Sequence, residues 1–161
     1  MVDDVLAANA RYSQSFRDPH LAGTAAKGLA VLTCIDSRID PLAMLGLVPG
    51  DAKILRNAGA RATTDALRGL AMAVNFLDVT RICVVVHTDC AMSGRNDDDV
   101  RHALADRGIP ADGWEFHTAP DQIAALASDM TRIRECPLIS KSVEVVGLVL
   151  DVHTGRLSSP L

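Results

Sequence analysis

Short apolar runs alternate with amphipathic stretches along most of the chain. Four of the runs have the length of strands and span residues 28–33, 52–55, 81–86 and 143–152. Apolar residues at helical spacing and helix-start signals predict helices over residues 41–47, 64–77, 97–105 and 120–133. Because strands alternate with helices, we expect a single-domain α/β fold with a mostly parallel central sheet flanked by helices.

The two ends of the chain differ from this alternating pattern. Apolar residues near the N-terminus recur at helical spacing, and Asp18-Pro19 ends the pattern. Residues 18–27 are small and contain Gly and Pro, which predicts a linker. We therefore expect an N-terminal helical arm, residues 1–17, that stands off from the body and packs on a partner subunit. Near the C-terminus, residues 153–156 predict a hairpin turn into an antiparallel edge segment.

Length and composition favour one globular domain over residues 1–161. The 161 residues are 48% hydrophobic and carry a formal net charge of −4, which allows a sizeable core. No cluster of Lys and Arg stands out, so we do not expect a nucleic-acid partner. No basic start precedes a long apolar stretch, so we expect neither a signal peptide nor a membrane span, and we expect a cytoplasmic protein.

The four cysteines fall into two kinds. In a reducing cytosol, cysteines pack, bind metal or react more often than they form disulfides. Cys83 lies inside an apolar strand, and Cys136 has no His or second Cys nearby. Both are interpreted as small buried hydrophobes. Cys34 and Cys90, in contrast, have charged groups or a histidine beside them.

Two polar clusters follow predicted strands. Cys34, Asp36 and Arg38 follow the first strand, and His87 and Cys90 follow the third. In a parallel sheet, functional groups gather outside the carboxyl ends of the strands. Two thiolates and one neutral imidazole leave the fourth position of a tetrahedral zinc open, which is the arrangement that catalytic zinc needs.

Asp36 and Arg38 decide whether that fourth position stays open. Asp36 is two residues from Cys34 and can reach the metal as a fourth ligand, which would block the site. The Arg38 guanidinium offers a bidentate fork for the same carboxylate and can hold it away. An open zinc lowers the pKa of its water to about 7, and Asp36 can orient the resulting nucleophile. Small electrophilic carbons suit such a site best.

These residues resemble the paired zinc motifs of the β-class carbonic anhydrases, and most of all their small prokaryotic and mycobacterial branch. The resemblance runs from residue 29 to residue 157 and includes residues 34–38, 55–59 and 87–90. It implies one Zn²⁺ per subunit held by Cys34, His87 and Cys90, a catalytic Asp36–Arg38 pair, and reversible hydration of CO₂ to bicarbonate. It also implies a homodimer or a dimer of dimers, in which the first helix embraces the neighbouring subunit.

Two further residues are weaker candidates for substrate or anion binding. Arg56 is either an anion contact near the pocket or a structural Arg bonded to loop carbonyls. Ala91 stands where the family usually has Gly. If the backbone there needs positive φ, Ala strains the loop; if only room is needed, one methyl group narrows the pocket. The other four histidines lack ligand-like spacing, and the sequence identifies none of them as a proton shuttle.

The sequence leaves three alternative functions open. The same zinc chemistry can hydrolyse carbonyl sulfide or carbon disulfide, which are isoelectronic relatives of CO₂. Cys90 and Arg95 form a C-x4-R loop of the kind that metal-free, rhodanese-like sulfurtransferases use. A zinc closed permanently by Asp36 would serve only folding or assembly.

Overall fold

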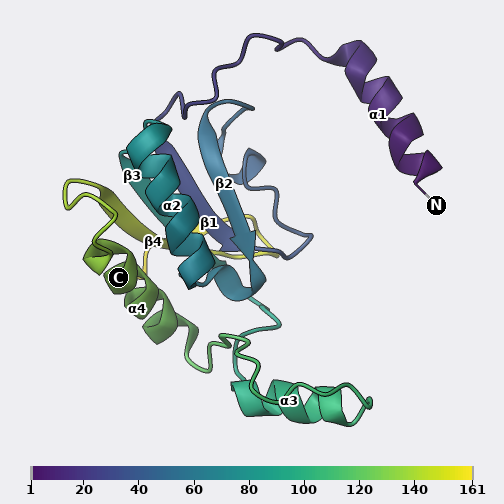
Figure 1. The fold of residues 1–161 in the computed structure, drawn as a ribbon, viewed down its shortest axis with the longest axis vertical. Coiled ribbons are helices and arrows are strands. Elements are labelled where there is room, and N and C mark those ends of the chain that lie inside the picture. The colour runs from purple at the N-terminus through teal and green to yellow at the C-terminus, as the bar shows by residue number, and fades with distance from the viewer. Residues whose placement is uncertain (1, 161) are drawn as a thin grey trace.

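A computed structural model describes residues 2–160, so Met1 of the predicted arm and Leu161 lie outside the described residues. Its centre is a five-stranded sheet in the order β2-β1-β3-β4-β5; Figure 1 labels β1 to β4 of this sheet. The strands are β1 (Leu29–Cys34), β2 (Ala52–Asn57), β3 (Arg81–His87), β4 (Glu144–Leu150) and β5 (Leu157–Ser158). The first four are parallel and β5 is antiparallel to β4, which confirms the predicted α/β fold and its C-terminal edge.

Within the described chain, four α-helices accompany the sheet: α1 (Asp3–Ser15), α2 (Thr64–Phe76), α3 (Asp97–Ala105) and α4 (Gln122–Glu135). Side-chain caps explain where three of them begin. The Thr63 side chain accepts an N–H bond at the start of α2, and Asp121 accepts two at the start of α4. Asn96 and Asp99 form a reciprocal capping box at the start of α3.

Several predicted elements differ from the structure in extent: α4 lies two residues later than predicted, and β4 is shorter than the predicted range of 143–152. The helix expected over residues 41–47 forms only a single 3₁₀ turn, Ala43–Leu45. The Asp40 carboxylate accepts the backbone N–H groups that open this turn, and Gly46 adopts a left-handed conformation with φ of 63°, so the chain leaves the helix after one turn. Strand β2 runs two residues beyond the predicted end, because it stays paired with β1 up to Asn57 opposite Cys34.

Helices α2 and α4 cover one face of the sheet (Figure 1). Leu70 of α2 and Leu126 of α4 join Leu32 and Val84 of the sheet in one buried cluster. Alternate strand residues point to the opposite face, where a second cluster includes Val31 and is completed by partly buried side chains of loops and strands. No member of this second cluster comes from the four described helices, so this face is only partly covered.

Helix α1 stands away from the body at the end of an extended segment (Figure 1). None of its described residues is buried, and Val5, Leu6 and Tyr12 are exposed. Residues 25–27 bind the segment to the body through backbone hydrogen bonds to Leu77, Gly50 and Asp51. No helix in residues 2–160 has the length and apolarity needed to cross a bilayer.

Helix α3 belongs to an excursion, residues 93–119, that we call the α3 lobe and that projects from the body (Figure 1). Ser93 and Ala119 form a parallel bridge at its stem. The Asp97 carboxylate closes the lobe from inside, because it accepts the backbone N–H groups of Phe116 and Thr118 and the Thr118 hydroxyl. The stem thus joins the loop after β3 to the segment that leads into α4.

Candidate metal centre

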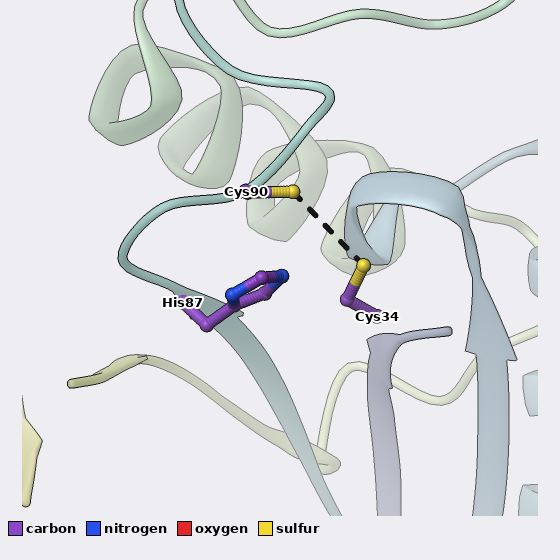
Figure 2. Close-up of side chains that lie close together, drawn as sticks. All are labelled: Cys34, His87 and Cys90. Carbon is purple, nitrogen blue, oxygen red and sulfur yellow. Dashed lines mark hydrogen bonds between the residues drawn. The ribbon is translucent and has the colours of Figure 1, made fainter. Parts of the chain in front are cut away.

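The carboxyl ends of β1 and β3 bring three potential metal ligands together, as Figure 2 shows. The Sγ atoms of Cys34 and Cys90 lie 4.0 Å apart, and one ligand atom from each of Cys34, His87 and Cys90 lies within 4.8 Å of the others. All three side chains are buried. Zn–S bonds of about 2.3 Å in a tetrahedral site place two sulfurs about 3.8 Å apart, so the observed pair is already spaced for zinc.

The tautomer of His87 prepares its ring for a metal. Nδ1 lies 2.8 Å from the carbonyl oxygen of Thr88, so this nitrogen carries the hydrogen and Nε2 has a free lone pair. Among the described residues, Nε2 of His87 is buried without a hydrogen-bond partner. A buried polar atom without a partner is unfavourable unless a ligand satisfies it. The residues present therefore fit a zinc ion, with Nε2 as the nitrogen ligand.

The two thiols perturb each other. The contact with Cys90 lowers the pKa of the Cys34 thiol, and the backbone N–H of Gly59, 3.3 Å from Cys34 Sγ, lowers it further. The contact with Cys34, together with burial, raises the pKa of the Cys90 thiol. The two sulfurs therefore share a proton unequally in the metal-free pair, whereas metal binding takes both as thiolates and releases their protons.

Asp36 and Arg38 form a bidentate pair at the edge of this centre. Nε and Nη2 of Arg38 donate to the two carboxylate oxygens at 2.9 and 2.8 Å, and the Arg38 backbone N–H adds a bond of 2.9 Å. These bonds hold the pKa of the Asp36 carboxyl well below its usual range. Oδ2 of Asp36 lies 3.9 Å from Nε2 of His87, so the carboxylate borders the centre while Arg38 engages both of its oxygens.

Arg56 lies behind the loop that carries this pair. Its guanidinium donates to the carbonyl oxygens of Cys34, Asp36 and Ile39 at 2.9, 2.7 and 3.2 Å. These bonds join residues 34–39 to β2. They favour a structural role for Arg56 over a role in anion binding.

Ala91 takes its place without unusual backbone geometry. The residues other than Gly with positive φ in residues 2–160 include Asp89, at 53°, but not Ala91. Ala91 therefore does not strain the backbone of this loop, as it would if a positive φ were needed there. Ala91 is exposed, as is Arg95, whereas Cys90 faces Cys34 in the interior, which favours a metal ligand over a free sulfurtransferase nucleophile.

A mostly buried ion pair supports the centre from the helical side of the sheet. Nε of Arg61 donates to Oδ2 of Asp129 in α4 at 2.6 Å. Nη1 of Arg61 donates to the carbonyl oxygens of His117 and Thr118 at 2.7 and 2.9 Å. Arg61 lies two residues after Gly59, so this ion pair fixes the segment that touches Cys34 to both α4 and the stem of the α3 lobe.

The contact between Asp89 and His153 is not predicted by the sequence. Oδ2 of Asp89 and Nε2 of His153 lie 2.6 Å apart, although the residues are 64 positions apart in the chain. No spacing rule links them. The available signal is that Asp89 follows β3 and His153 follows β4, and β3 and β4 are neighbours in the sheet.

Comparisons with known proteins agree with this geometry. A family model described as carbonic anhydrase matches residues 29–110. β-Carbonic anhydrase 1 of Mycobacterium tuberculosis is 35% identical over 98% of this chain and 96% of that protein. A carbon disulfide hydrolase of an Acidianus species is 34% identical and covers 82% of this chain and 76% of its own. The crystal structure of carbonic anhydrase from Streptococcus mutans matches with a TM-score of 0.91 at 32% identity, over 98% of this chain and 95% of that one. The chain belongs to the β-carbonic anhydrase family.

Proposed function

We propose that the protein catalyses the reversible hydration of CO₂ to bicarbonate and a proton, with one zinc ion held by Cys34, His87 and Cys90. The observation that carries this proposal is the buried Nε2 of His87, which faces two thiols and has no hydrogen-bond partner among the described residues. When bound at such a site, zinc activates water as a nucleophile at neutral pH.

Asp36 orients the reacting water, and Arg38 controls whether Asp36 can approach the metal. Arg38 keeps the Asp36 carboxyl ionised at neutral pH through its hydrogen bonds, so the carboxylate can accept a hydrogen bond from the reacting water and orient it. The same bonds keep Asp36 from approaching the metal as a fourth ligand. The pair therefore acts as a latch: open while Arg38 holds the carboxylate, closed when Asp36 turns to the metal.

Metal analysis combined with stopped-flow CO₂ hydration tests the function. We expect stoichiometric zinc in the purified protein and hydration activity that disappears when a chelator removes the metal and returns when zinc is added. A chain that retains zinc but hydrates no CO₂ would reject the proposal and leave a structural metal as the explanation.

Carbon disulfide or carbonyl sulfide is the second candidate substrate, because carbon disulfide hydrolases of Acidianus and Saccharolobus solfataricus are 34% and 30% identical to this chain. Those matches cover 82% of this chain, against 98% for the mycobacterial carbonic anhydrase. We therefore expect CO₂ to be the better substrate. Parallel assays of one zinc-loaded preparation with CO₂, carbonyl sulfide and carbon disulfide decide between them.

We further propose that the chain forms a homodimer or a dimer of dimers in the cytoplasm, with α1 of each copy packed on the body of the next. The exposed apolar side chains of α1 and the partly covered face of the sheet support this. Light scattering of Tyr12→Asp should show dissociation. Gln14→Asp, half a helical turn away on α1, is the control and should leave the mass unchanged.

A further inference from the structure

Two loops meet beside the metal centre. One is residues 87–90 after β3, and the other is the β4–β5 turn, residues 151–156. The Thr88 N–H donates to the Leu150 carbonyl oxygen at 3.0 Å, and the Val152 N–H donates to the Thr88 hydroxyl at 3.1 Å. With the 2.6 Å contact between Asp89 and His153, these bonds fix one imidazole ring at the rim of the centre.

Continuous contacts connect that ring to the proposed reaction site. The carbonyl oxygen of Asp89 accepts a hydrogen bond from Nη2 of Arg38 at 3.2 Å. Arg38 holds Asp36, whose Oδ2 lies 3.9 Å from Nε2 of His87. At the outer end, the His153 side chain is 69% exposed. His153 thus lies between the metal centre and bulk solvent.

The proposed reaction needs a group in that place. Hydration of CO₂ by one water gives bicarbonate and one proton, and the proton must leave before the next turnover. Asp36 is poorly placed to carry the proton away, because Arg38 already donates to both of its carboxylate oxygens. Histidine is the side chain that exchanges protons most readily near neutral pH.

The charged groups around the ring permit this role. The Asp89 carboxylate faces Nε2, and on the same turn the Asp151 carboxylate accepts the backbone N–H of His153 at 2.8 Å. The nearby cation is Arg38. Its Nη2 donates to the backbone carbonyl oxygen of Asp89 and not to the Asp89 carboxylate. An imidazolium at position 153 is therefore flanked by two negative charges.

We propose that His153 takes up the proton released at the metal centre and transfers it to buffer, and that Asp89 orients its ring. The inference rests on the proposed CO₂ hydration. Nε2–H donates to Asp89, so the lone pair on Nδ1 accepts the proton from water at the rim, and neutral His153 becomes imidazolium. Nδ1 then gives the proton to a buffer base, which returns the ring to its neutral form.

Stopped-flow CO₂ hydration by the zinc-loaded full chain at several buffer concentrations tests the proposal. In His153→Ala we expect kcat to fall about tenfold, because general acid–base groups contribute at least this much, while kcat/KM stays within about twofold. Added imidazole should restore kcat to a saturating level. The control is His102→Ala, an exposed histidine on α3, which should leave kcat unchanged and unresponsive to imidazole.

His153→Gln separates proton transfer from loop positioning. Glutamine keeps an N–H that can donate to Asp89, but it cannot take up and release a proton near neutral pH. An equal loss of kcat in the Gln variant supports proton transfer. Full kcat in that variant, a parallel fall of kcat and kcat/KM in both variants, or unchanged kcat in His153→Ala would each overturn it. In the metal-free chain, ¹⁵N shifts should place the ring hydrogen on Nε2, and a hydrogen on Nδ1 contradicts the proposed orientation. A zinc-loaded wild type that hydrates no CO₂ rejects the proposed function instead.

Discussion

The guanidinium of Arg38 engages both oxygens of the Asp36 carboxylate, at 2.9 and 2.8 Å. Because the pair is bidentate, it fixes the plane of the carboxylate as well as its distance. Oδ2 of Asp36 consequently remains at the border of the centre, 3.9 Å from Nε2 of His87.

Arg38→Ala should reduce CO₂ hydration near neutral pH by about 100-fold or more, because a displaced reacting group alone can have this effect and the freed Asp36 can occupy the metal. Zinc content should stay unchanged. The control is Arg68→Ala, which removes another Arg–Asp pair, with Asp65, on the exposed surface of α2; both Arg68 nitrogens donate to Oδ1 of Asp65. Full activity of Arg38→Ala would reject the latch.

Cys34→Ser and Cys90→Ser should each abolish stoichiometric zinc binding, because a hydroxyl is a far weaker zinc ligand than a thiolate. Cys136→Ser, outside the centre, should retain the metal. In the wild type, zinc retention should weaken as the pH falls, because protons compete with the metal for the two sulfurs and for His87. A chromophoric chelator measures the zinc content of each variant and of the wild type at each pH. Retention of stoichiometric zinc in Cys34→Ser or Cys90→Ser would contradict their assignment as zinc ligands.

Asp129→Ala should lower the free energy of unfolding by about 3–5 kcal/mol, because it leaves a mostly buried guanidinium without its partner. The side chains of Arg61 and Asp129 are 17% and 6% exposed. Asp65→Ala breaks the exposed pair with Arg68 and should cost less than about 1 kcal/mol. Urea denaturation of the zinc-loaded proteins gives both values, and equal effects would show that burial of the pair is unimportant.

Asp97→Asn should destabilise the protein in a pH-dependent way. The Thr118 hydroxyl and backbone N–H groups hold the pKa of the Asp97 carboxyl below its usual range. A depressed pKa gives stability that is present above the unfolded value and is lost as the pH falls through the folded value. The variant should therefore lose about 1–2 kcal/mol at pH 7, and its deficit should narrow below about pH 4.

Urea titrations of Asp97→Asn at pH 7 and pH 3 measure that change in deficit. Asp98→Asn, at the adjacent exposed position, is the control. A deficit of the same size at both pH values would mean that the ionised carboxylate of Asp97 contributes nothing.

Much of the fold and of the metal centre could be predicted because both depend on local patterns. Buried parallel strands are apolar along their length, so β1 and β3 stand out in the sequence. Cys34 and His87 end these strands, and a parallel sheet brings such ends together. The positions of two of the candidate ligands, Cys34 and His87, thus follow from where two apolar runs stop.

The remaining contacts depend on tertiary structure. The ion pair of Arg61 with Asp129 and the contact of Asp89 with His153 each link residues more than 60 positions apart, with no periodicity to reveal them. The N–H of Gly59 reaches Cys34 only because the backbone turns left-handed there, at φ 80°. The helix that Pro41 suggested is reduced to one turn, where the Asp40 carboxylate accepts the first backbone N–H groups.

The narrow stem of the α3 lobe makes it a natural place for change in length. The chain enters and leaves through one bridge, Ser93 with Ala119, while Gly108 and Gly113 near the far end have open space around them. Insertions at such tips are tolerated when the flanking backbone stays hydrogen-bonded. A reporter or affinity domain grafted between these two glycines would be carried at a distance from the candidate metal centre. Changes in the length of the lobe during evolution could use the same position.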